Sequence, residues 1–420
     1  MMKILQISAG DFFSTYGGGQ VYVKNIVDEM VRQGYDVTIV SYVGKGSVSL
    51  RKYNGCTIYE VNNDAKLEEI IREINPSVIH AHSRKGLTCR IAKTLGIPVV
   101  VTAHHGGILC PAGTLMMCDD SICNVVVNHK NCLRCTLRNT RTGLYWYPFM
   151  RLLSESAYIS LGKRLKRMPF IPFITPIGGA ALSIQGKRDE WQSICDGCTR
   201  MVAPSNAMAD AMVRNGMDAG KITVVPHGIP LPDNKAQMPP IVDGKVKFFH
   251  VGRIGYVKGL HVLLKAFHNL QAPNAELHLI GEAANKGERR YAASLHKLYD
   301  CDKRIIWHGK VAPTDVFNTI KDFHISSSSS YLESFGLNMA ESLAMGKPVL
   351  ATRNGGAEMQ VVDGENGWLV PTNNVEAMKQ KMVEIIAHPE LWINMDTTSH
   401  VVSIEKHVKE LVEIYEVLRD

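Results

Sequence analysis

The chain has no uninterrupted apolar run of about 18 residues, the length that a helix needs to cross the hydrocarbon core of a bilayer. Its first apolar run, residues 2–8, is only as long as a strand and meets a polar segment, so it lacks the pattern of a signal peptide. We therefore expect a cytoplasmic protein. In that compartment ten cysteines are expected to be reduced, buried or metal-bound rather than joined in disulfides.

The chain also lacks a strong charge bias, because its formal excess of seven positive charges is mild for 420 residues. The excess is local: between Arg138 and Arg167, seven Lys or Arg stand against one acid, Glu155. Four aromatic residues are interleaved with them, namely Tyr145, Trp146, Tyr147 and Phe149. This pattern suits a peripheral contact with anionic lipid headgroups, at the inner face of the cell membrane. A solvated helix whose aromatic side chains pack inward explains it as well. We expect no nucleic-acid partner.

A nicotinamide-binding fingerprint is missing from the first half. Strand-length apolar runs at residues 3–8 and 35–42 flank helical spacing over residues 21–33, which is a βαβ pattern. The loop between them carries Gly17, Gly18 and Gly19, which would let the backbone approach a phosphate. It lacks the G-x-G-x-x-G spacing, and the second strand has no acid at its end.

Two histidines follow short β-branched runs in the same half. His82 ends the run PSVIHAHS, and His104 follows IPVVVTA. The carboxyl edge of a parallel sheet is where ligands bind, so both are better placed for function than most of the sixteen histidines. The alternative for either residue is a structural histidine.

Five cysteines fall within 26 residues, at Cys110, Cys118, Cys123, Cys132 and Cys135. The last two have a spacing that lets two thiolates hold one ion, and a third and fourth could complete a tetrahedral set. We expect a structural zinc site, with an iron–sulfur cluster or unligated thiols as alternatives. His105 and His129 are reserve ligands. A second pair, Cys195 and Cys198, is interpreted as structural or incidental.

In the second half, Arg253 follows a strand pattern and Lys258 comes five residues later. Two fixed cations at a sheet edge can neutralise a diphosphate leaving group, as a divalent metal would. We therefore expect no catalytic divalent metal. An exposed turn is the alternative.

Residues 325–346 begin with five serines, which we expect to form a flexible approach to a helix that starts near Phe335. Glu333 would then lie in the loop and Glu341 on the second turn. A helix N-terminus with Gly336 suits a diphosphate, and carboxylates beside it suit the hydroxyls of an attached sugar or ribose. The alternative is that Glu333 belongs to a cap and Glu341 is a solvated helix residue.

Glu333 and Glu341, with Ser334, Phe335 and Gly336 between them, resemble the E-x7-E motif of the retaining glycosyltransferase family 4. The similarity continues through GKPVLATRNGGAEMQVVDGENGWLV. The family has the GT-B fold, so the resemblance implies two facing Rossmann-like α/β domains with the active site in the cleft between them. It implies residues 1–232 with a returning helix at 402–420 as one domain and residues 240–401 as the other. The proline-rich stretch 229–245 is the predicted linker.

The resemblance also implies roles. Arg253 and Lys258 match the family's R-x4-K pair and would stabilise the departing diphosphate with the helix N-terminus at Gly336 and Leu337. Glu333 would orient the donor sugar, Glu341 would bind the ribose, and His104 would support charge at the sugar ring. Three weaker donor contacts are also implied, at Gly17, Gly18 and the backbone of Val311.

We thus expect a retaining transfer from a nucleotide-sugar, UDP- or GDP-linked, to a hydroxyl of a glycan or lipid-linked saccharide. No carboxylate pair is placed for the double displacement of a retaining glycosidase. One alternative is a nucleotide-sugar epimerase or hydrolase on the same fold, which would turn over donor without an acceptor. Another is a non-catalytic binding or assembly protein, whose mark would be loss of the cations or glutamates. The residues leave the sugar and the acceptor open.

Overall fold

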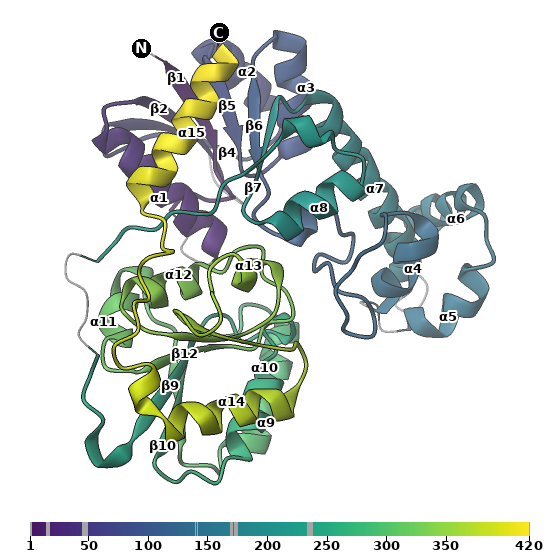
Figure 1. Ribbon diagram of the computed structural model, residues 1–420. Coiled ribbons are helices and arrows are strands. Elements are labelled where there is room, and N and C mark those ends of the chain that lie inside the picture. The colour runs from purple at the N-terminus through teal and green to yellow at the C-terminus, as the bar shows by residue number, and fades with distance from the viewer. Residues whose placement is uncertain are drawn as a thin grey trace. The chain divides into compact units, whose positions relative to one another are not determined.

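The computed structural model (Figure 1) describes residues 2–13, 17–43, 49–138, 140, 142–168, 171, 175–232 and 238–419. Residues 233–237 of the predicted linker and Arg141 of the basic segment therefore lie outside the described residues. The chain divides into two compact units. Unit 1 comprises Met1–Phe12, Met30–Val225 and Leu411–Asp420, and unit 2 comprises Phe13–Glu29 and Pro226–Glu410. In the described residues no helix is long and apolar enough to cross a membrane.

Unit 1 contains an eight-stranded sheet in the order β3-β4-β2-β1-β5-β6-β7-β8, in which only the β3–β4 pair is antiparallel. Every side chain of β5 and β6 is buried, because helices cover both faces of a parallel sheet. The strands are β1 (Lys3–Ile7), β2 (Asp36–Tyr42), β3 (Ser49–Tyr53), β4 (Cys56–Val61), β5 (Val78–Ala81), β6 (Val99–Thr102), β7 (Arg200–Ala203) and β8 (Ile222–Val224).

A helical insertion, residues 103–199, separates β6 from β7. Its helix α7 packs against α3, α4 and α6, and Figure 1 shows α4, α5 and α6 gathered beside one end of α7, away from the strands. The helices of the first half are α1 (Gly18–Arg32), α2 (Ala65–Ile74), α3 (Lys85–Leu95), α4 (His129–Arg138), α5 (Gly143–Met150), α6 (Glu155–Arg167), α7 (Thr175–Gly197) and α8 (Asn206–Arg214).

Unit 2 contains a six-stranded parallel sheet in the order β11-β10-β9-β12-β13-β14. Its strands are β9 (Val246–Val251), β10 (Ala275–Ile280), β11 (Ile305–Gly309), β12 (Ile325–Ser328), β13 (Val349–Thr352) and β14 (Gly367–Val370). Its helices are α9 (Leu260–His268), α10 (Lys286–Tyr299), α11 (Val316–Ile320), α12 (Leu337–Ala344), α13 (Gly355–Glu358) and α14 (Val375–Ala387). The prediction of two Rossmann-like α/β sheets is confirmed.

The order of the second sheet reverses between β9 and β12, which pair with each other. The first sheet reverses between β1 and β5. In open α/β sheets, ligands bind at the carboxyl ends of the strands beside such a reversal, because the connecting helices depart to opposite faces there. The segments that follow β9 and β12 in unit 2, and β1 and β5 in unit 1, therefore come first in a search for the site.

The last helix, α15 (Ile404–Arg419), anchors its final turns in unit 1, which includes Leu411–Asp420. The Tyr415 hydroxyl lies 2.5 Å from Nδ1 of His80, and Nε2 of His80 lies 2.7 Å from the Thr102 hydroxyl. All three side chains are buried. The end of the chain therefore contributes a polar contact to the core of unit 1.

We expect Tyr415→Phe to lower the free energy of unfolding by about 1 to 2 kcal/mol, because it leaves one nitrogen of His80 buried without its partner. Urea unfolding measures the change. Tyr299→Phe, at a buried tyrosine of unit 2 whose ring packs against His268, is the control and is expected to change stability less. Equal stability of Tyr415→Phe and the unmodified protein would contradict this account.

Candidate active site

Lys258 lies in the loop between β9 and α9, at the reversal in the second sheet. Its ammonium donates a hydrogen bond to Oε1 of Glu333, 75 residues further along the chain, and only 20% of the lysine side chain and 11% of the glutamate side chain is exposed. Ser329 Oγ also donates to the Lys258 carbonyl at 3.0 Å. An ammonium has three N–H donors, so this pair leaves two for a ligand.

Gly259 is the reason that the lysine can lie so close to β12. It adopts φ 62°, and a Cβ atom there would lie 2.0 Å from the carbonyl oxygen of Ser329. Only glycine permits this approach, since both the left-handed conformation and the contact exclude a side chain.

Glu333 is held from several sides in the loop that follows β12. Ser330 Oγ donates to its Oε1 at 2.8 Å, and the Gly356 amide donates to its backbone carbonyl at 2.9 Å. With Lys258 this makes a serine, a lysine and a glutamate linked around one carboxylate oxygen. The predicted capping role for Glu333 does not describe this contact, because the carboxylate binds a lysine and a serine hydroxyl.

Arg253 points to a different acid. Its Nη1 donates to Oε1 of Glu288 at 2.9 Å, and 56% of the arginine side chain remains exposed. Glu288 is in the first turn of α10, where Oε2 also accepts from the Ala284 amide at 2.8 Å. The structure thus places both predicted cations after β9 and gives each its own carboxylate partner.

Helix α12 begins at Leu337, two residues after the predicted start, with Gly336 as its N-cap at φ 91°. A Cβ atom on Gly336 would lie 2.4 Å from the Met339 side chain. Glu341 is on the second turn, as predicted, and burial raises the pKa of its carboxyl to about 7. Among the described residues its carboxylate makes no hydrogen bond or ion pair with a side chain, so the predicted solvated surface residue is a poor description.

The five serines of the approach are not a flexible loop, and that prediction is wrong. Ser326–Ser328 lie in β12, and all five side chains from Ser326 to Ser330 are buried. Ser342 Oγ of α12 donates to Ser326 Oγ at 2.9 Å. Small side chains on a central strand let the helix pack closely against it. The prediction of a loop was made from the polarity of the five serines, which does not show their small size at work in packing.

In unit 1, His82 and His104 are neighbours after β5 and β6. Nδ1 of His82 lies 2.9 Å from Nε2 of His104, and Nε2 of His82 lies 2.9 Å from Oε1 of Gln6. The amide nitrogen of Gln6 is directed to Met30 Sδ at 3.6 Å, so its oxygen faces His82 and accepts from it. In a neutral His82 ring Nδ1 then accepts, and Nε2 of His104 donates.

The remaining predicted donor contacts have these positions. Gly17 and Gly18 stand at the start of α1, and Val311 lies beyond the end of edge strand β11, half-buried against an apolar cluster. Ser334 and Phe335 are buried before α12, where the Phe335 carbonyl accepts from Gln360 Nε2 at 2.5 Å. Their roles toward a ligand stay predictions.

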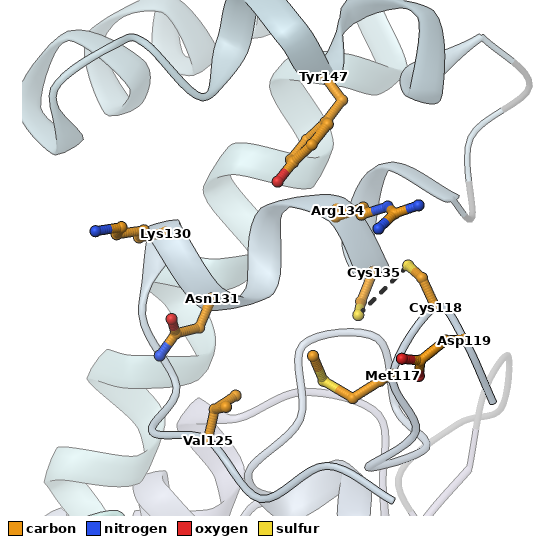
Figure 2. Close-up of a pocket in the computed structure, with 9 residues that line it drawn as sticks. All are labelled: Met117, Cys118, Asp119, Val125, Lys130, Asn131, Arg134, Cys135 and Tyr147. Atoms are coloured by element: carbon orange, nitrogen blue, oxygen red, sulfur yellow. Dashed lines mark hydrogen bonds between the residues drawn. The ribbon is translucent and has the colours of Figure 1, made fainter. Parts of the chain in front are cut away.

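The cysteine-rich segment forms a pocket of about 270 Å³ in the helical insertion (Figure 2). Its walls are Met117, Cys118, Asp119, Val125, Lys130, Asn131, Arg134, Cys135 and Tyr147. Figure 2 shows the sulfur atoms of Cys118 and Cys135 directed toward each other, and Cys118 Sγ donates to Cys135 Sγ at 3.6 Å. That separation is close to the ~3.8 Å between two sulfurs on one tetrahedral zinc.

Of the other predicted ligands, Cys110 lies near enough to Cys123, Cys132 and Cys135 to interact with them electrostatically. Among the described residues no group of three or more His, Cys, Asp or Glu could hold a metal ion. Burial raises the pKa of Cys132 to about 11 and that of Cys135 to about 12. The reserve ligand His105 accepts from the Gly107 amide at 3.0 Å, and Nδ1 of His129 lies 3.1 Å from Glu155. The zinc site, with its iron–sulfur alternative, stays a prediction.

Cys198 of the second pair donates to the Arg200 carbonyl at 3.0 Å and also hydrogen-bonds with Cys89. The interpretation of this pair as structural agrees with its place beside Cys89 rather than in the first cluster.

Sequence reasoning missed three residues of the site: Glu288, Ser330 and Gln6. Each contacts a predicted residue from a distant element or from inside the serine run. Glu288 has a local signal, because Asn285 caps α10 by accepting from the Glu288 amide at 3.0 Å, which marks a helix start. Nothing local indicates that this carboxylate binds Arg253, 35 residues away.

Two segments of the chain match known protein families. Residues 233–399 match the model "Glycosyl transferases group 1", and residues 16–115 match the model "Glycosyltransferase Family 4". The first model covers the whole of the Lys258, Glu333 and Glu341 region, and the second covers His82 and His104.

Curated relatives match over part of their length. A D-inositol 3-phosphate glycosyltransferase of Arthrobacter sp. (strain FB24) is 32% identical over 189 residues, which is 42% of this chain and 45% of that protein. A lipopolysaccharide 1,2-N-acetylglucosaminetransferase of Salmonella typhimurium is 29% identical over 192 residues, 41% of this chain and 49% of that protein. The chain thus matches just under half the length of these relatives.

Solved structures resemble the whole chain. Anabaena HepE, crystallised with UDP and glucose, has a TM-score of 0.68 at 16% identity and covers 99% of this chain and 100% of its own. Sucrose-phosphate synthase of Thermosynechococcus elongatus has a TM-score of 0.71 at 17% identity. The match covers 100% of this chain and 99% of the synthase chain. At such identities the likeness establishes the fold.

Proposed function

Because the chain belongs to the GT-B glycosyltransferases of the family 4 type, we propose that it transfers a sugar from a nucleotide-sugar to an acceptor hydroxyl with retention at the anomeric carbon. The observation that carries the proposal is the contact of Lys258 with Glu333 beside the N-terminus of α12, at the reversal of the second sheet. A cation and a helix N-terminus suit a diphosphate, and the carboxylate suits sugar hydroxyls.

In the proposed reaction, two donors of the Lys258 ammonium bind diphosphate oxygens as the bond to the sugar breaks. Arg253 adds a second positive group, since its half-exposed guanidinium keeps donors beyond the one that binds Glu288. The acceptor oxygen forms its bond to the anomeric carbon as the diphosphate leaves, and an oxygen of the departing phosphate takes the proton of the acceptor hydroxyl. Stabilising charge that develops on the leaving group lowers the barrier of the chemical step. These cations take the place of a divalent metal.

Glu333 is proposed to orient the donor sugar. Ser330 and Lys258 both bind its Oε1, so Oε2 is the oxygen left to accept from a hydroxyl. Glu341 is proposed to accept from the ribose hydroxyls, which would supply the side-chain partners that this partly buried carboxyl lacks among the described residues.

His104 is proposed to support positive charge at the sugar ring, with His82 and Gln6 as positioning residues. Because His82 receives the Nε2 hydrogen of His104, the other nitrogen, Nδ1, is the atom that would act toward the sugar. The neutral side-chain amide of Gln6 sets the direction of the His104–His82 hydrogen bond without adding a charge.

Donor and acceptor are proposed by class. HepE was crystallised with UDP and glucose, so UDP-sugars come first among donors, ahead of GDP-sugars. The acceptor proposed is a glycan or a lipid-linked saccharide. We also propose the structural zinc site, which would take no part in the sugar transfer. Metal analysis of protein purified without oxygen tests it.

A thermal-shift screen of UDP-, GDP- and ADP-glucose, followed by product analysis with soluble and lipid-linked acceptors, tests the function. We expect one nucleotide-sugar to raise the melting temperature and product to form only with an acceptor. Donor turnover without acceptor would favour the epimerase or hydrolase alternative. If no nucleotide-sugar stabilises the protein, the enzymatic proposal is wrong, and a binding or assembly role is favoured.

A further inference from the structure

Exposed apolar side chains are concentrated on α5, in the turn that follows it and just after the end of α6. Of the 22 large hydrophobic side chains that are exposed in the described part of the chain, eight lie within residues 144–171. They are Leu144, Tyr145, Trp146, Phe149, Leu152, Leu153, Met168 and Ile171. Soluble proteins expose single apolar residues often, but eight exposed apolar side chains within one short stretch of chain indicate a contact surface.

Helix α5 explains why the group exists. It contains no charged residue, and only one of its sides packs into the insertion, through Tyr147 and Met150. Tyr145 and Phe149 are 81% and 67% exposed, and Leu152 in the following turn is 78% exposed. The aromatic side chains therefore do not all pack inward, which was the alternative explanation of this segment.

Positive charge accompanies the exposed apolar side chains. Lys163, Arg164, Lys166 and Arg167 are all exposed on the last turns of α6. None of the four forms an ion pair with a carboxylate in the described residues. The single acid, Glu155, pairs with Arg188 of α7 and lies 3.1 Å from Nδ1 of His129. The local excess of positive charge is thus unopposed.

We propose that the surface formed by these eight apolar side chains and the four cations of α6 docks on an anionic lipid bilayer. Aromatic and aliphatic side chains would enter the headgroup region while the lysines and arginines of α6 bind lipid phosphates. Charge selects this partner over a second copy of the chain, since two such surfaces would bring like charges together. The proposal does not rest on the proposed sugar transfer, because it uses no residue of the candidate site.

Sedimentation of the full chain with lipid vesicles tests the role of charge. We expect binding to phosphatidylcholine vesicles that contain phosphatidylglycerol and weak binding to phosphatidylcholine alone. Raising the salt from about 50 to about 500 mM should release the protein, because the Debye length shortens severalfold. The variant K163Q/R164Q/K166Q/R167Q should bind at least about a hundredfold more weakly. The matched variant K286Q/R289Q/R290Q/K297Q, which removes four charges from α10 of unit 2, should bind like the unmodified protein.

A second variant separates the apolar contribution from charge. Y145S/F149S/L152S should weaken binding at least about tenfold at low salt without changing the melting temperature, since these side chains are exposed. V213S/L298S/V417S, at exposed apolar positions on other elements, is its control. Equal binding to neutral and anionic vesicles, or unchanged binding by either test variant, would overturn the proposal. So would a dimer in sedimentation equilibrium that Y145S/F149S/L152S dissociates, because the surface would then join two copies.

Discussion

Replacing Lys258 with alanine is expected to lower kcat/KM for sugar transfer roughly 10- to 150-fold, which corresponds to the ~1.5 to 3 kcal/mol of a hydrogen bond to a charged group. The loss should fall mainly on kcat, because charge on the diphosphate grows as the bond to the sugar breaks. Steady-state kinetics with the donor found in the screen measures it.

The structure adds a second consequence that a leaving-group role alone would not predict. Without the ammonium, the Glu333 carboxylate keeps only Ser330 as a side-chain partner in a site where 11% of it is exposed. Removing one member of such a pair destabilises a protein, because the other charge stays desolvated. We therefore expect a lower melting temperature as well.

The double variant K258M/E333Q separates the two effects. It should regain most of the stability, since no unpaired charge remains, while its kcat stays low. Lys265→Ala, at an exposed lysine in the last turn of α9, is the matched control and should alter neither quantity. Turnover by Lys258→Ala equal to that of the unmodified enzyme would refute the assigned role.

Replacing Glu341 with glutamine is expected to raise the donor KM roughly 10- to 100-fold, since the ionised carboxylate would bind the ribose hydroxyls more tightly than an amide oxygen. Burial raises the pKa of this carboxyl to about 7. The donor KM of the unmodified enzyme should therefore rise as the pH falls from 8 to 6, because protonation removes the charge. Glu341→Gln should remove this dependence.

Stability gives a readout of the same group that needs no substrate. The folded-state pKa of Glu341 lies above the ordinary glutamate value of 4.5, so the folded protein binds this proton more tightly than the unfolded chain does. The contribution to stability is fully present below about pH 4.5 and is lost as the pH rises through about 7. At pH 8, Glu341→Gln should therefore unfold at a higher urea concentration than the unmodified protein. Its free energy of unfolding should be higher by up to roughly 3 kcal/mol.

The control for this pair of experiments is Glu384→Gln, at an exposed carboxylate of α14 that pairs with Lys381 at 2.6 Å. It should change neither the donor KM nor the difference between the donor KM at pH 6 and the donor KM at pH 8. A pH profile of the donor KM that is the same in Glu341→Gln and the unmodified enzyme would assign the titration to another group.

Local patterns in the sequence predicted the elements well where one physical rule dominates. The helix after Gly336 is an example, because glycine, helical spacing and a following apolar run agree, and α12 starts within two residues of the prediction.

The serine run shows where such patterns fail. Composition indicated a solvated loop, whereas β12 is a central strand whose serines are buried under α12. A buried hydroxyl needs a hydrogen-bond partner, and two of the partners here come from other elements: Ser342 of α12 for Ser326, and the Lys258 carbonyl for Ser329. α5 shows the same limit, because its composition cannot say which of Tyr145 and Tyr147 faces solvent.

The sequence alone determined the α/β class, the two cations after β9, the two glutamates around α12 and the family, because these depend on spacing along the chain. The tertiary structure decided how they are paired. Lys258 and Glu333, 75 residues apart, meet because β9 and β12 are neighbours in the second sheet, and burial gives Glu341 its raised pKa. Contacts and dielectric surroundings are properties of the packed chain, so no local pattern could have supplied them.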